Sequence, residues 1–95
     1  MKLNYKASNI AKAEREYGMK FFKAFNSMNE MGVAELQFLY RAGGASDEEF
    51  DEMFAKGIEE AFVPILEGIN DAGFLAEKID IQNFKEALKS PAPKK

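Results

Sequence analysis

Apolar residues recur at helical spacing in several short stretches of this 95-residue chain, and glycines separate most of these stretches. The strongest pattern covers residues 58–72, where apolar and small residues follow the i, i+3, i+4, i+7 spacing of one helix face. Pro64 interrupts the stretch, but the apolar phase continues beyond it. We therefore expect one amphipathic helix that is kinked at the proline, with a break near Phe62 as the less favoured alternative.

Helix boundaries are marked by capping residues. Ser46 followed by Glu49 matches a capping box, in which each side chain accepts a hydrogen bond from the other residue's amide. Ser8 is expected to cap the first helix, and Gly18 to end it in a left-handed conformation. The alternation before Ser8 predicts an extended lead-in or a short edge strand. The expected helices cover about residues 9–17, 19–31, 33–42, 47–56, 58–72 and 81–89, with a break near Asn29 as an alternative for the second.

These patterns predict an all-α fold, a compact bundle of about five short helices with a disordered C-terminal tail. The mass of 10.7 kDa suits one domain. We expect residues 1–89 to form a single helical domain and the proline-bearing residues 90–95 to form the tail.

The residue inventory argues against most catalytic chemistry. The chain has no histidine, cysteine or tryptophan, so disulfides, cysteine nucleophiles and histidine proton shuttles are impossible. The acidic run at residues 47–52 lacks the alternating ligands and central glycine of a calcium loop. Adjacent carboxylates such as Glu59 and Glu60 diverge on a helix and do not share a site. We expect no enzyme, no catalytic residues, no cofactor and no metal.

Charge is unevenly distributed along the chain. Residues 1–45 carry seven bases and four acids, whereas residues 46–72 carry nine acids and only Lys56 as a base. Nucleic-acid binding is not expected, because the sequence shows no concentrated basic face. The acidic block is interpreted either as a solvated helix face or as a docking surface for a basic segment of a partner or a second copy. The polar N-terminus and the lack of a long apolar run predict a cytoplasmic chain without membrane contact.

Large apolar side chains are more abundant than a core of this size requires. Nine Phe and five Met are present, and most Phe residues fall on helical stripes that predict core positions. The pattern places Val33, Phe54 and Ile58 on inward faces, whereas Phe38 is expected to project away from its helix stripe. The broad aromatic face of residues 19–31 exceeds what one packing neighbour needs. The candidate protein-binding residues are Phe21, Phe22, Phe25, Met28, Met31, Phe38 and Met53.

The succession of these features resembles a known family. The segment Leu39-Tyr40-Arg41-Ala42-Gly43 follows an aromatic helix and precedes the capped acidic helix and the long last amphipathic helix. Over residues 3–75 this order is similar to the tail assembly chaperones of long-tailed, siphovirus-type bacteriophages and prophages. The resemblance implies a small, helical, non-enzymatic protein of the bacterial host cytoplasm. It further implies that the chain binds and solubilises the tape measure protein, recruits major tail tube protein subunits and forms homo-oligomers.

Two other classes of protein are compatible with the same residues. One is a small phage or bacterial regulatory protein, such as an inhibitor that binds one folded target. The other is a structural connector protein that stays in a particle. A chaperone is distinguished from both because it keeps an extended client soluble and is absent from the finished virion.

Overall fold

The computed structural model describes residues 2–27, 30, 32–73 and 81–83. Its regular elements within these ranges are helices: α1 (Ala7–Tyr17), α2 (Phe21–Asn26), α3 (Val33–Ala42), α4 (Asp47–Ala55) and α5 (Ile58–Ala72), with a helical turn at 81–83. The expected all-α fold is therefore confirmed. The predicted tail at 90–95 and most of the predicted last helix lie outside the described residues.

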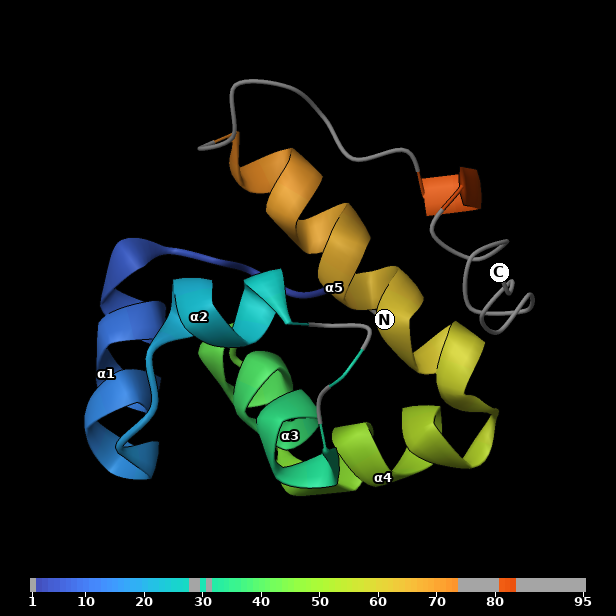
Figure 1. The fold of residues 1–95 in the computed structure, drawn as a ribbon, viewed down its shortest axis with the longest axis horizontal. Coiled ribbons are helices and arrows are strands. Elements are labelled where there is room, and N and C mark those ends of the chain that lie inside the picture. The colour runs from blue at the N-terminus through green and yellow to red at the C-terminus, as the bar shows by residue number, and fades with distance from the viewer. Residues whose placement is uncertain (1, 28–29, 31, 74–80, 84–95) are drawn as a thin grey trace.

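Helix α3 occupies the centre of the fold. It packs against α1, α2 and α4, while α5 packs against α4 (Figure 1). Leu36, Leu39 and Tyr40 of α3 are fully buried, as are Ile65 and Ile69 on the apolar face of α5, and all five belong to one core cluster. Burial of such side chains contributes about 1.5–3 kcal/mol each, so this face supplies much of the stability.

The N-terminal segment is an extended lead-in that lies between α3 and α5. It runs from α1 toward α5 in Figure 1, and both Leu3 and Tyr5 are buried. The segment approaches two glycines so closely that a Cβ on Gly43 would lie 2.7 Å from the Cβ of Leu3, and one on Gly68 would lie 2.9 Å from the Tyr5 ring. The absence of a side chain at these two glycines therefore leaves the space that the N-terminal segment occupies.

Two tyrosine hydroxyls tie the core together. Tyr5 donates a hydrogen bond to the carbonyl of Leu39 at 2.8 Å, and Tyr40 donates to the carbonyl of Ala61 at 2.5 Å. Ala61 follows Glu60, the residue whose carbonyl cannot receive the regular helix hydrogen bond because Pro64 lacks an N–H. Helix α5 is nevertheless continuous through Pro64, as the unchanged apolar phase predicted.

Some of the predicted helix boundaries are confirmed and others are wrong. The capping box of Ser46 and Glu49 is present, and Gly18 ends α1 in a left-handed conformation. Ser8, however, is not the cap of α1, because the helix already begins at Ala7. Helix α2 begins at Phe21 and ends at Asn26, so it is shorter than predicted, consistent with the weak helix propensity of Asn26 and Ser27.

Candidate protein-interaction surface

The residues predicted to bind a partner occupy different depths in the structure. Phe21 and Phe38 are fully buried, whereas Phe25 and Met53 are half-buried. Phe22 is 56% exposed and so lies at the surface. Met28 and Met31 fall outside the described residues. Of the predicted set, the structure thus places Phe22 on the surface and the half-buried Phe25 and Met53 at its margins.

The expectation that Phe38 projects away from the core is wrong. Helix α1 covers this side of α3, and the Phe38 ring packs against Tyr17 with 5.8 Å between ring centroids. Helix α3 is therefore buried on more than one face. A single-stripe interpretation fails for a helix that has neighbours on several sides.

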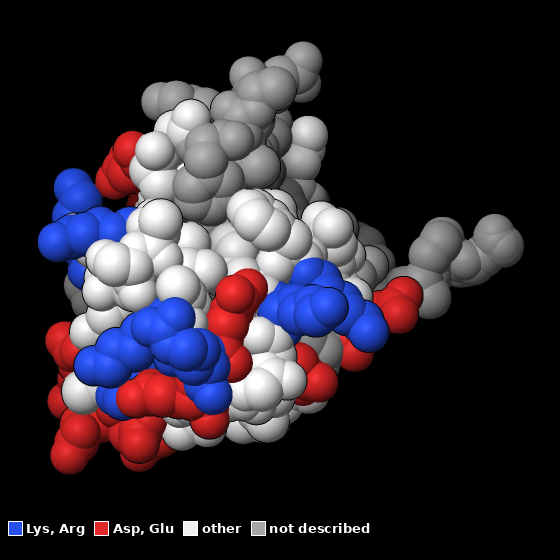
Figure 2. Space-filling view, turned by 90° about the vertical axis from the view of Figure 1, so that its left-hand side faces the viewer, with Lys and Arg blue, Asp and Glu red and all other residues white. Residues whose placement is uncertain are grey.

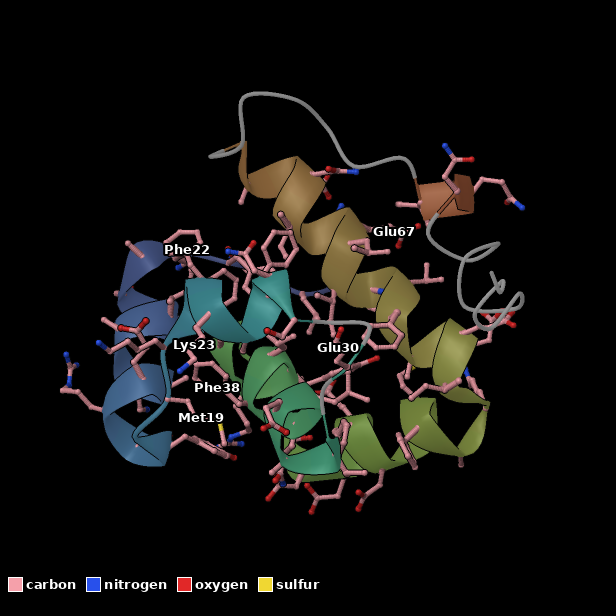
Figure 3. The ribbon with its side chains drawn as sticks, in the orientation of Figure 1. Met19, Phe22, Lys23, Glu30, Phe38 and Glu67 are labelled. Atoms are coloured by element: carbon pink, nitrogen blue, oxygen red, sulfur yellow. The ribbon has the colours of Figure 1, made fainter. Side chains whose placement is uncertain are left out.

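Phe21 anchors α2 in a cluster of rings. Its ring centroid lies 5.4 Å from that of Tyr5 and 5.3 Å from that of Phe22, and its ring is stacked on Phe25 at 6.3 Å. The amide of Phe21 donates a hydrogen bond to Glu14 Oε2 at 2.9 Å, which fixes the start of α2 against α1. Phe22 is the member of this cluster that is exposed at the surface (Figure 3).

Sequence reasoning missed a second exposed apolar surface, which we call the α4–α5 corner and define by Phe54 and Ile58. Both were predicted to point inward, but Phe54 is 38% exposed and Ile58 is 49% exposed. Val33, at the first position of α3, is also exposed against expectation. All three residues lie in the first or last turn of a helix, where neighbouring elements cover the apolar stripe least. This position is the signal from which their exposure could have been predicted.

The two surfaces have opposite charged surroundings. In the sequence around Phe22, the charged residues are the exposed Lys20, which precedes α2, and Lys23 on α2. The charged side chains of α4, by contrast, are all acids and are all exposed. These are Asp47, Glu48, Glu49, Asp51 and Glu52. Electrostatic attraction would therefore favour different partner segments at the two surfaces.

Basic side chains do not form a continuous face on the α1 and α2 side of the molecule. Figure 2 shows that side, and its Lys and Arg side chains form separate groups with Asp and Glu between them. Nucleic-acid binding relies on a concentrated basic surface. The side shown does not provide one.

A hollow of about 380 Å³ lies beside α2. Met19, Lys23 and Glu30 are among its lining residues and are labelled in Figure 3. The lining mixes lysines with glutamates, and the Glu35 carboxylate already accepts a hydrogen bond from the amide of Gly32 at 2.9 Å. Within the described ranges, no three acidic side chains come together in a way that could hold a metal ion.

The buried tyrosines are structural groups. Burial raises the pKa of Tyr5 well above its usual value, and the nearby Tyr40 adds to the effect. Burial also raises the pKa of Tyr40. Both hydroxyls remain protonated at neutral pH and donate to backbone carbonyls. They stabilise the packing of the N-terminal segment and of α5 on α3.

Comparison with known proteins identifies no relative: no family model matches the chain, and no curated protein or solved structure is significantly similar to it. Among the helices of the described residues, none is long and apolar enough to cross a membrane.

Proposed function

We propose that this chain is a tail assembly chaperone of a long-tailed bacteriophage or prophage, which binds the tape measure protein and helps recruit tail tube subunits. The order of sequence features over residues 3–75 resembles that family. The observation that carries the proposal is the exposure of large apolar side chains at Phe22 and at the α4–α5 corner of an otherwise well-packed helical subunit.

Exposed side chains of this size favour association with an apolar partner. Covering one Phe or Ile side chain gains up to about 1.5–3 kcal/mol, which is modest for a single contact. A tape measure protein is long, so many subunits can bind along it, and each contact remains reversible. Weak individual contacts suit a protein that must leave the tail before the virion is complete.

Co-expression with the tape measure protein of the same phage tests this proposal. The tape measure protein should be insoluble alone and soluble with the chain, and mass spectrometry should not find the chain in finished virions. An unchanged insoluble fraction would contradict chaperone function. Persistence of the chain in virions at fixed stoichiometry would identify a connector instead, and tight binding to one folded enzyme would identify an inhibitor.

A further inference from the structure

Packing against the core holds Phe54 of the α4–α5 corner in place. Phe54 lies in the last turn of α4 and Ile58 is the first residue of α5, with the exposed Lys56 and Gly57 between them. The centroid of the Phe54 ring lies 5.8 Å from that of Phe50, which lies 5.3 Å from that of the fully buried Tyr40. A row of aromatic rings thus extends from the core to the surface and holds Phe54 in place.

Acidic side chains flank this apolar pair on both sides. Asp51 and Glu52 precede Phe54 and are exposed, while Glu59 and Glu60 follow Ile58 on α5. Residues 51–60 around the corner carry four acids against Lys56 alone, a net charge of −3 (1 − 4). The apolar pair supplies the contact area, and the surrounding charge selects a partner of positive sign.

The secondary structure of the surface limits how a partner can bind. Within the described residues every regular element is a helix, so a partner finds no sheet edge there to which it could add a strand. A common mode on a helical surface is docking of an amphipathic helix whose apolar residues pack against exposed apolar side chains.

We propose that the α4–α5 corner docks a basic amphipathic helix of the client, in which lysines or arginines flank apolar residues spaced three and four apart. This inference rests on the proposed function and specifies the chemistry of the client segment. The charged residues nearest Phe22 in the sequence are lysines rather than acids, so the Phe22 surface offers the same segment no matching charge. The corner therefore gives the chain a preference for one class of client helix.

Fluorescence anisotropy with a labelled peptide tests the proposal. The probe is a helix of about 18 leucine and lysine residues with leucines at i, i+3, i+4 and i+7, compared with a peptide in which glutamate replaces every lysine. The full chain should bind the lysine peptide at least about tenfold more tightly than the glutamate peptide. Raising the salt from about 0.05 to 0.5 M should weaken binding of the lysine peptide.

Two variants locate the peptide on the chain. F54S/I58S removes the apolar pair, and D51K/E52K reverses two flanking charges without changing the core. Each should weaken binding of the lysine peptide about tenfold or more. The control E16K/E67K makes the same change in net charge at exposed positions on α1 and α5, with Glu67 placed away from the junction of α5 with α4 (Figure 3). It should bind much more tightly than D51K/E52K.

The outcomes separate this inference from the proposed function. Equal loss in D51K/E52K and E16K/E67K would show a general charge effect and overturn the corner as a site. Light scattering that shows the corner variants losing self-association, with no peptide binding by the unmodified chain, would assign the corner to a second copy. If the chain solubilises the tape measure protein and both corner variants do so equally well, the function stands and the corner proposal fails.

Discussion

At the scale of single residues, Gly68 reveals how closely the N-terminal segment packs. Alanine in place of a helical glycine ordinarily stabilises a protein by about 0.4–1 kcal/mol. Here the added Cβ would lie 2.9 Å from the Tyr5 ring and 3.1 Å from the Leu3 carbonyl oxygen. We expect Gly68→Ala to lower the free energy of unfolding by about 1–3 kcal/mol, measured by urea denaturation.

The double variant with Tyr5→Ala provides the control for this substitution. Removing the ring destabilises the chain by itself, but it also relieves the clash with the new methyl group. The combined loss should therefore be smaller than the sum of the two single losses. Simple additivity, or a stabilising Gly68→Ala substitution, would mean that the N-terminal segment does not occupy the space between α3 and α5.

The hydroxyl of Tyr40 has a measurable role of its own. Tyr40→Phe keeps the ring but removes the donor to the Ala61 carbonyl, which lies in the turn before Pro64. Loss of a buried hydrogen bond of this kind should cost about 1–2 kcal/mol in the free energy of unfolding. Tyr17→Phe is the matched control, because Tyr17 is half-buried and contacts Phe38 through its ring. A loss in Tyr40→Phe no larger than in Tyr17→Phe would argue against this role.

Burial of Tyr5 and Tyr40 also predicts how stability depends on pH. Both groups have a pKa in the folded chain above the usual tyrosine value of about 10, so the folded state retains protons that the unfolded state loses. Their contribution is complete below about pH 10 and is lost as the pH rises from there toward the folded-state pKa. The urea midpoint should thus fall more steeply above pH 10 in the unmodified chain than in Y5F/Y40F. Parallel pH profiles would contradict the assignment of these groups as buried.

At the scale of elements, the start of α4 depends on its capping box. The Ser46 hydroxyl accepts from the Glu49 amide at 3.2 Å, and the Glu49 carboxylate accepts from the Ser46 amide at 2.8 Å. Ser46→Ala should therefore destabilise the chain by about 1 kcal/mol in thermal or urea denaturation. Ser8→Ala is the control, because α1 begins before Ser8 and the substitution should change stability little. Equal effects of the two substitutions would show that the cap is not what holds α4.

The observed helix bounds show which sequence signals are sufficient to predict where a helix begins and ends. Helix α3 has the predicted bounds because a glycine precedes it and two glycines follow it, and the box at Ser46 marks α4 in the same local way. Such signals depend on residues close together in the chain. The Ser8 prediction failed although serine is a good cap, because position along the chain alone does not decide which residue starts a helix.

Burial was harder to predict than helix position. Phe38 is buried because α1 covers it, and no residue near Phe38 encodes that contact. Phe54 and Ile58 continue apolar stripes into the ends of their helices, where other elements cover them less. Periodicity identifies a face, but only the arrangement of all the helices determines how far along that face burial extends. The candidate site was accordingly predicted in part, with Phe22 included and the α4–α5 corner missed.

At the scale of the whole molecule, the fold combines a tight centre with apolar side chains left at its ends. Buried side chains of α3 and α5 and the inserted N-terminal segment form one continuous core. The exposed Phe22 and Phe54 contact the rings of the buried Phe21 and Phe50, and Ile58 is exposed at the start of α5. Changing them should therefore affect partner binding far more than stability.

The central claim is that these exposed side chains hold the client. The most direct test measures how much tape measure protein stays soluble during co-expression with the unmodified chain or with F22S/F54S/I58S, after circular dichroism has shown that both are folded. The control K12S/A34S/E48S changes three other exposed positions. We predict that the control keeps the client soluble and that F22S/F54S/I58S does not. Full solubility with the folded F22S/F54S/I58S variant would contradict the account.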